Sequence, residues 1–185
     1  MRLYYTSISG EDLTQTRSDL SLGGFRSGTV IPNNKFGNLF GDLSCYSINQ
    51  NEEEFIATAL KNETGAQVEN VTIYLDYPKK TVDGVEIIDS QKLIEVSPVA
   101  FNSNNELEII GTPYSEPYTT EFYSIEGVAN AINIGSIPID GQIGLWLKRV
   151  INKSLIEQEF SNENLEENGT PSKSIEEISL VISWD

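Results

Sequence analysis

The sequence contains no histidine, and this absence narrows the chemistry open to it. Histidine is the commonest general base at neutral pH, so the Ser-His-Asp and Cys-His catalytic arrangements are excluded, as are imidazole metal ligands. The single cysteine, Cys45, excludes a disulfide framework within the chain and a cysteine-based metal site. Gly23 and Gly24 are not followed by the Lys-Ser or Lys-Thr pair of a phosphate-binding loop. We therefore expect no catalytic activity and no cofactor.

Basic residues are also scarce, because 12 Lys and Arg stand against 28 Asp and Glu, a formal net charge of −16. Such a charge repels phosphate backbones and anionic lipid headgroups, so we expect neither nucleic acid nor a membrane as a partner. Long apolar runs are missing too, since no segment approaches the ~20 residues that span a bilayer. The beginning of the chain lacks the apolar core of a secretory signal, and we expect the protein to stay in the cytoplasm until it assembles.

The acidic residues are distributed unevenly along the chain. Residues 1–50 have four acids and four bases, whereas the net charge is −6 over residues 51–100, −3 over residues 101–153 and −7 over residues 154–185. A neutral, glycine-rich first quarter therefore precedes an acidic body. Because surface carboxylates keep a protein soluble, we interpret most of this acidity as a solvated surface rather than a cation site.

What the sequence has in abundance is the pattern of β-strands, most clearly between Phe55 and Tyr77. An apolar run ends there at a polar turn, and alternation of period two follows. Val71, Ile73 and Leu75 share one face, as in a strand that buries one side, and Pro78 then ends the pattern.

Short strands of this kind recur along the chain, separated by turn signals such as Asp83-Gly84 and Asp140-Gly141. Helical periodicity is nearly absent, and strands at this spacing are typical of a sandwich of two sheets. We therefore predict an all-β antiparallel sandwich. The predicted strands are Met1–Thr6, Glu54–Leu60, Val68–Tyr77, Val85–Ile88, Leu93–Val96, Glu106–Ile110, Thr120–Ile125, Val128–Ile134, Gln142–Ile151 and Ile178–Trp184.

The first 45 residues differ from the rest. Residues 1–45 are predicted to form a first strand and a long irregular N-terminal arm rich in Gly and Asn, and residues 46–185 to form the sandwich. From residue 8 to 43 the chain is too apolar for a free linker and too broken for long strands, and long loops of this kind are usually functional or linkers. The arm packs either on its own sandwich or on a neighbouring subunit, and the sequence pattern does not distinguish between these two arrangements. Residues 154–171 are predicted to form an acidic insertion or loop.

Pairs of carboxylates raise the question of a metal site or a hydrolase. Glu52–Glu54 and Glu157/Glu159 offer oxygen ligands for a hard cation, and Glu106/Glu108 would share one strand face as glycosidase acids can. The patterned Asp, Asn and Gly of a calcium loop is missing. We therefore interpret these residues as the approach to a strand or its solvent face, and predict no metal site.

Two stretches resemble the signatures of Ig-like sandwiches. Residues 61–78 contain an Asn-x-Thr-Gly turn before an Asn-Val-x-Ile strand, and residues 132–149 contain a Gly-Gln turn before a final strand. The resemblance implies an Ig-like arrangement of the predicted sandwich but no particular function, because such domains host many activities. The matching residues are Asn62, Thr64, Gly65, Asn70, Val71, Ile73, Gly141 and Gln142.

The segment SLGGFRSGTVIPNNKFGNLFGDLS, residues 21–44, is similar to small virion structural proteins of tailed bacteriophages, in particular the neck and tail ring components of crAss-like podoviruses. The resemblance implies a non-enzymatic virion protein, assembled in the host cytoplasm, that forms a ring homo-oligomer and binds other virion proteins. The matching residues are Ser21–Gly24, Pro32–Asn34, Asn38–Phe40 and Lys61–Gly65.

A closed ring needs complementary surfaces on each subunit, and an apolar arm on an acidic body offers one of them. We predict that the arm docks on a neighbouring subunit or another virion protein. Two basic residues beside Trp146 form a spot that could meet an acidic neighbour, although solvated charges at a strand end are the simpler explanation. The predicted partner-binding residues are Leu22, Phe25, Phe36, Leu39, Phe40, Lys148 and Arg149.

Aromatic residues around Pro113–Pro117 favour an alternative function. Tyr114, Tyr118 and Tyr123 could form a platform for sugar rings, as in carbohydrate-binding sandwiches. They could equally cover an edge of the sandwich with their hydroxyls in water. The alternative is therefore a carbohydrate- or receptor-binding module of a phage tail or baseplate.

Overall fold

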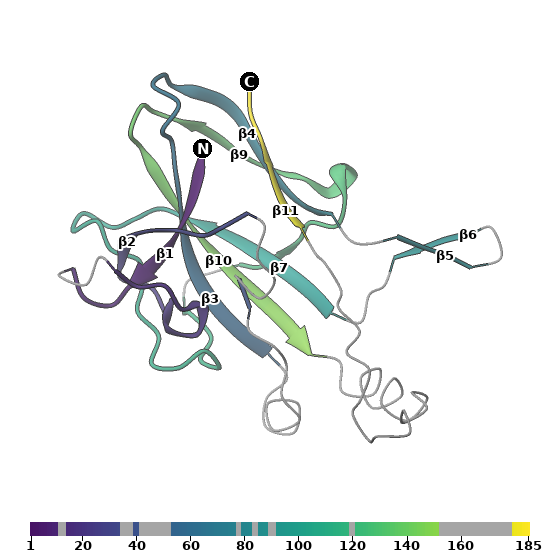
Figure 1. Ribbon diagram of the computed structural model, residues 1–185, viewed down its shortest axis with the longest axis horizontal. Helices are drawn as coiled ribbons and strands as arrows, with labels where there is room; N and C mark the ends of the chain where they lie inside the picture. Colours follow the sequence, from purple (N-terminus) through teal and green to yellow (C-terminus); the bar gives the residue numbers. More distant parts are fainter. Residues whose placement is uncertain are drawn as a thin grey trace.

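The computed structural model describes residues 1–10, 14–33, 39–40, 53–76, 79–82, 85–88, 92–118, 121–151 and 179–185. Over these residues the chain is nearly all β, with two antiparallel sheets and two single-turn 3-10 helices, Ser18–Leu20 and Val128–Asn130 (Figure 1). The predicted all-β sandwich is confirmed. The strands are β1 (Arg2–Ser7), β2 (Phe25–Val30), β3 (Glu53–Lys61), β4 (Val68–Asp76), β5 (Lys79–Val82), β6 (Val85–Ile88), β7 (Lys92–Val99), β8 (Tyr123–Ser124), β9 (Ile132–Ile137), β10 (Gln142–Ile151) and β11 (Ser179–Ser183).

The larger sheet has six strands in the order β2-β1-β3-β10-β7-β8, and the smaller sheet has three in the order β11-β4-β9. Strands β5 and β6 pair in a separate hairpin, with Val82 opposite Val85 as the Asp83-Gly84 signal predicts. The larger sheet therefore has β3 and β10 at its centre. Each is paired on both sides.

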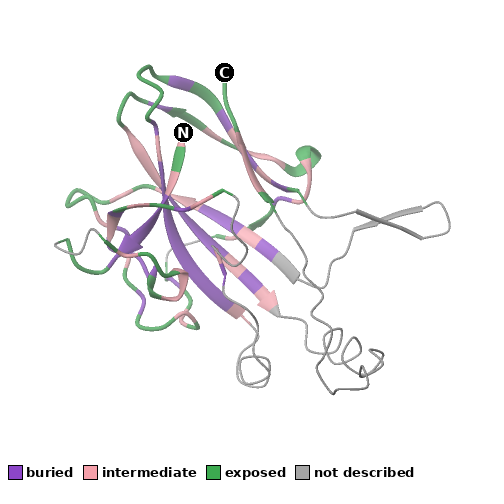
Figure 2. Cartoon of the chain, in the orientation of Figure 1, coloured by how far each residue is buried: buried purple, intermediate pink, exposed green. Residues whose placement is uncertain are grey.

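The centre of the larger sheet is buried on both faces (Figure 2). Every side chain from Phe55 to Leu60 is buried, which explains why the sequence there is a continuous apolar run and does not alternate. Ile56 and Leu60 face the smaller sheet, whereas Phe55 and Ala57 face the opposite way.

The smaller sheet covers the inner face of the larger one. Its central strand, β4, alternates as predicted: Val71, Ile73 and Leu75 are buried in the core between the sheets, and Thr72 and Tyr74 lie on the outer face. The core is completed from the larger sheet by Ile94, Val96, Leu145 and Leu147.

Some predicted strands are wrong or displaced. Glu106–Ile110 forms only an isolated bridge, between Leu107 and Gly24, because this segment lies across the outer face of the larger sheet and not within it. Of the strand predicted at Thr120–Ile125, the described residues 121–125 contain only the two-residue strand β8, and the strand predicted from Val128 begins at Ile132 after a 3-10 turn. The prediction also missed β5.

The N-terminal arm contains more regular structure than its glycines predict. Residues Phe25–Val30 form β2, which pairs antiparallel with β1 at the edge of the larger sheet, with a register shift between Tyr4 and Thr6. The prediction of an irregular segment is therefore wrong for these residues. The predicted acidic loop at 154–171 lies outside the described residues.

Candidate functional site

The outer face of the larger sheet is covered by loops instead of a sheet. A second apolar cluster lies there and is built from both central strands and from two loop segments, residues 18–24 and 101–122. Its buried members are Leu22, Phe55, Ala57, Leu107, Ile110 and Trp146, with Val99, Phe101 and Phe122 packed at its margin. The loops are therefore part of the core, and the surface that they expose to solvent is held in a fixed position.

Two glycines join the two loop segments. Gly24 and Leu107 exchange backbone hydrogen bonds of 3.2 and 2.8 Å, and the Ile110 N–H donates to the Leu22 carbonyl over 3.0 Å. Gly23 has a φ of +98°, and a Cβ atom on it would lie 1.7 Å from the carbonyl oxygen of Glu108. Only glycine fits this close approach of two backbones.

Buried hydroxyl groups hold the first loop on the sheet. The Ser21 Oγ accepts a hydrogen bond from the Thr6 N–H over 2.7 Å and donates to the Ala57 carbonyl over 2.6 Å. The Thr6 Oγ1 accepts from the Gly23 N–H over 3.1 Å. Ala57 also donates its N–H to the Ser21 carbonyl. Together these bonds satisfy the backbone groups at the point where β1 stops pairing with β3.

The predicted arm residues are divided between the core and the surface. Leu22 and Phe40 are only 8% exposed and belong to the two cores of their own chain. Packing within their own fold leaves them little surface for a neighbour, and their role as partner-binding residues stays a prediction. Phe25 and Leu39 are half-buried, Leu39 against the inner core, and Phe36 lies outside the described residues.

Arg149 contacts its own chain and not open solvent. Its guanidinium pairs with the Glu54 carboxylate, the two side chains being 10% and 11% exposed, and lies 4.8 Å from the centre of the Phe40 ring. A cation held this way on the inner face has no free surface for an acidic neighbour. The structure pairs Arg149 within its own chain, and its role as a partner-binding residue stays a prediction.

Lys148 lies on the opposite face of the same strand. Its ammonium pairs with Glu95 and lies 3.7 Å from a Glu53 oxygen and 5.2 Å from the Phe122 ring centre. Burial alone would lower the pKa of Lys148, but the hydrogen bond and charge of Glu95 outweigh it and raise this pKa. The amine is thus paired inside its own subunit, and its role as a partner-binding residue stays a prediction.

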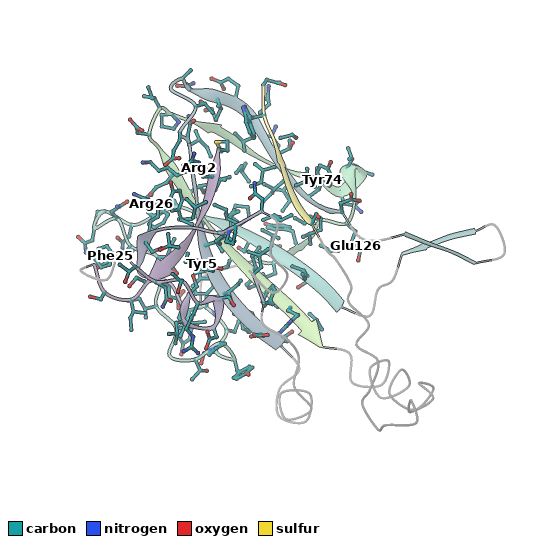
Figure 3. The ribbon with its side chains drawn as sticks, in the orientation of Figure 1. Arg2, Tyr5, Phe25, Arg26, Tyr74 and Glu126 are labelled. Carbon is teal, nitrogen blue, oxygen red and sulfur yellow. The ribbon has the colours of Figure 1, made fainter. Side chains whose placement is uncertain are left out.

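A basic cluster that the sequence analysis missed lies at the β1–β2 edge (Figure 3). The Tyr4 hydroxyl donates to Glu63 over 2.5 Å, and Arg26 stacks on the Tyr4 ring at 4.7 Å. Arg2 and Lys61 lie 3.4 and 3.7 Å from the Glu63 carboxylate. The bond from Tyr4 holds the pKa of Glu63 below its ordinary value, and burial raises the pKa of Tyr4. No sequence motif marks this cluster, because strand pairing alone brings its members together.

Large apolar side chains are exposed beside the glycine pair. Ile8 is 59% exposed and Ile109 is 51% exposed. A Cβ atom on Gly24 would lie 3.0 Å from the Cα of Ile8, and one on Gly23 would lie 3.2 Å from the Cα of Ile109. Leu20, in the loop segment 18–24 that contains the glycine pair, is 43% exposed. We call Ile8, Leu20 and Ile109 the apolar loop surface. It is rimmed by Tyr118, whose N–H donates to the Glu108 carboxylate over 3.0 and 3.1 Å.

The three predicted tyrosines do not form one platform. Tyr118 is 96% exposed and Tyr114 is 42% exposed, both on the outer loops, whereas Tyr123 belongs to β8 and donates its hydroxyl to Glu121 over 2.9 Å. Within the described part of the chain, no two of these rings are in contact. Phe122, next to Tyr123, points inward and packs on Phe55 with ring centres 5.6 Å apart.

The sheet edges differ in how well they are protected. Edge strand β9 pairs with β4 through two register shifts and contains Gly135 at a φ of +83°. Edge strand β11 pairs with β4 at five consecutive positions with no shift. Edge strand β8 has only two residues, and β2 carries the shift noted above. Bulges and short strands are the usual protection of an edge, and β11 has neither.

Among the described residues, no group of three or more acidic or cysteine side chains is placed to hold a metal ion. The same residues include no helix of the length and hydrophobicity needed to cross a membrane.

Comparisons with known proteins identify no relative of known function. No protein-family model matches the chain, and no curated protein matches it. Among solved structures, the crystal structure of GEBA250068378 from Sulfurospirillum deleyianum is similar over 53% of this chain and 79% of that chain, at 12% sequence identity and a TM-score of 0.21. A likeness this low carries no argument about fold or function.

Proposed function

We propose that this protein is a non-enzymatic structural component of a tailed-phage virion, a neck or tail ring protein that assembles through protein–protein contacts with copies of itself and with other virion proteins. The observation that carries the proposal is the apolar loop surface, Ile8, Leu20 and Ile109. Exposed large apolar side chains on a rigid scaffold are a feature of protein interfaces. The resemblance of residues 21–44 to phage virion proteins supplies the setting.

The geometry supports a head-to-tail contact better than a freely moving arm. The loops that carry Ile8 and Ile109 are fixed to the outer core by the Gly23–Glu108 approach and the Gly24–Leu107 bonds. A rigid surface presents the same shape to every neighbour, which a closed ring requires. In this proposal the loop surface docks, and Leu22, buried in the outer core, supports it from below.

The test is the assembly state of the purified chain. Size-exclusion chromatography with light scattering is expected to show a ring-sized species whose fraction of the protein rises with protein concentration. Ile109→Asp places a charge in the loop surface and is expected to shift the ring to monomers. Val128→Asp, at another exposed apolar position, is the matched control and is expected to assemble normally. Monomers at all concentrations for the unaltered chain, together with its absence from a map of the assembled particle, would contradict the proposal.

The near-complete exposure of Tyr118 favours a second candidate function, a carbohydrate- or receptor-binding module. A ring with both faces in water is suited to stacking on a sugar. Binding on a glycan array that Tyr118→Ala and Tyr114→Ala abolish, and Tyr123→Ala leaves intact, would support this candidate. No binding to host surface glycans would remove it.

A further inference from the structure

Strand β11 presents an open backbone edge. Among the described residues it pairs only with β4, at the side of the smaller sheet away from β9 (Figure 1). Opposite Leu180 lies Leu75, whose N–H donates to the Ile125 carbonyl and whose own carbonyl accepts from the Gly127 N–H, both at 2.8 Å. Because the backbone of Leu75 points away from β11, Leu180 and Leu75 form a non-hydrogen-bonded pair.

The register then fixes which groups of β11 face outward. In an antiparallel ladder, hydrogen-bonded and non-hydrogen-bonded pairs alternate, and both residues of a non-bonded pair point their N–H and C=O away from each other. Leu180 and Ile182 therefore direct their backbone donors and acceptors to the open edge. Their side chains pack, partly buried, against the core between the two sheets.

The side chains of β11 give the edge no protection. The strand reads Ser-Leu-Val-Ile-Ser and contains no charge, proline or glycine. A regular, uncharged edge strand is a template for pairing with another chain. Since the other edges of the two sheets are shifted in register or very short, β11 is the edge best suited to accept a further strand.

The sequence of β11 is nearly palindromic, since reversing it only exchanges Leu180 and Ile182. If two copies are placed antiparallel about Val181, Ser179 faces Ser183 and Val181 faces Val181. Leu180 then faces Ile182, so their cross-strand contact extends the core, and their outward backbone groups form hydrogen-bonded pairs. A two-fold contact of this kind uses the same surface on both subunits.

We propose that β11 pairs antiparallel with β11 of a second copy about a two-fold axis at Val181, so that the two smaller sheets become one continuous sheet. The inference rests on the proposed self-assembly and deepens it by naming one contact. A two-fold contact closes after two copies, so together with the head-to-tail contact at the loop surface it would join two rings face to face.

The charge of the chain sets how this contact responds to salt. Two copies of net charge −16 repel each other, and the paired strands carry no ion pair to offset the repulsion. Salt screens repulsion between exposed charges. The association is therefore expected to strengthen as ionic strength rises, whereas a contact made of ion pairs would weaken.

Disulfide trapping tests the register. In the non-hydrogen-bonded pair at Val181 the Cα atoms would be about 4.5 Å apart, within the range of a disulfide. In a Cys45→Ser background, Val181→Cys is expected to form a covalent dimer on mild oxidation. Ser136→Cys, an exposed position on edge strand β9, is the matched control and is expected to stay monomeric. Equal cross-linking of the two variants would overturn the proposal.

A charge variant tests the same contact without a covalent cross-link. Val181→Lys brings two cations together in the pair, and the dissociation constant from sedimentation is expected to rise at least tenfold, while Ser136→Lys leaves it unchanged. Circular dichroism checks that both variants are folded. Rings lost with Ile109→Asp but unaffected by Val181→Lys would overturn this contact and leave the proposed function standing. Efficient trapping at Val181 without rings would support the contact and count against the ring function.

Discussion

The two faces of the larger sheet are covered by different means. On the inner face, a regular sheet supplies Val71, Ile73 and Leu75 at every second position of one strand. On the outer face, irregular loops supply Leu22, Leu107 and Ile110 from two distant segments. Both covers bury the middle of the central strands, Glu54–Leu60 of β3 and Gly144–Leu147 of β10. The difference teaches that an irregular, glycine-rich segment can form part of a core, provided that its backbone bonds are satisfied locally.

The largest test of this comparison removes the central side chain of the outer core. Trp146→Ala is expected to lower the free energy of unfolding by about 4 kcal/mol, as large aromatic truncations in cores do. Leu145→Ala, the neighbouring inner-core position, is expected to cost about 3 kcal/mol. Urea denaturation measures both. A cost below about 1 kcal/mol for Trp146→Ala would mean that the loops are a loose cover and not a core.

Charged residues extend the comparison, because adjacent residues of β10 point to opposite faces. Arg149→Met leaves the Glu54 carboxylate without its guanidinium on the inner face and is expected to cost about 3 kcal/mol. Lys148→Met is expected to cost less, about 1 kcal/mol, because its partners Glu95 and Glu53 are more exposed. The double variant Arg149→Met with Glu54→Leu is expected to recover part of the loss. Equal costs for the two single variants would contradict the assigned burial.

The glycine junction tests the loop cover alone. Gly23→Ala is expected to cost about 2–3 kcal/mol, because the added methyl meets the Glu108 carbonyl and φ is positive. Gly127→Ala is the matched control, with a φ of +68° and open space around the Cβ position, and should cost only about 1 kcal/mol. Thermal unfolding distinguishes the two. Equal losses would show that backbone strain, and not the close approach, is what matters.

A smaller effect is expected from the orphaned donor in the outer core. Among the described residues, the Trp146 Nε1–H is buried without a hydrogen-bond partner. An unpaired buried donor costs about 1–3 kcal/mol, which offsets part of what the larger ring contributes. Trp146→Phe is therefore expected to cost far less than Trp146→Ala, within about 1 kcal/mol of the unaltered chain. A loss as large as that of the alanine variant would indicate that the indole N–H is bonded.

The smallest expected effect is the pH dependence of the Tyr4–Glu63 cluster. Because the folded pKa of Glu63 is lowered, its contribution is present above the unfolded value of about 4.3 and is lost as pH falls through the folded pKa. Because the folded pKa values of Tyr4 and Lys148 are raised, their contributions are lost as pH rises above about 10. Denaturation midpoints across pH measure both limbs. Glu63→Gln should flatten the acid limb and also weaken the alkaline limb, because the hydrogen bond to Glu63 and its charge help to raise the pKa of Tyr4. An unchanged acid limb would contradict this assignment.

The sequence predicts the strands of this fold better than its outer cover. The range Gln142–Ile151 matches β10, and Val85–Ile88 matches β6, because period-two alternation and Asp-Gly turns are local signals. The outer cover has no period, since its two segments are far apart in the chain and meet through a few backbone hydrogen bonds, those between Gly24 and Leu107 and between Ile110 and Leu22. Leu107 and Ile109 are two residues apart and would share one face of a strand. Leu107 is nevertheless buried and Ile109 exposed, because they lie on a loop above the sheet.

The candidate surfaces were predictable only in part. The sequence marks residues 8–43 as different from the rest of the chain, but it does not distinguish Leu22, which is buried in its own fold, from Leu20, which is exposed. Both are leucines next to Ser21, and their different burial depends on how each packs on the sheet beneath the loop. The β11 edge is likewise invisible in sequence, because an edge strand is defined by where its neighbours pair.

The order of strands in the larger sheet has a consequence for how the chain is made. Strand β3 takes its long partner, β10, from residues 142–151, and every strand of the smaller sheet lies between or after them in the sequence. A ribosome must therefore synthesise most of the chain before β3 can be paired on both sides. Until then its two apolar faces are open to other nascent chains, since long-range pairing is slow and exposed to aggregation. Chaperone binding during synthesis is the cellular need that this topology creates.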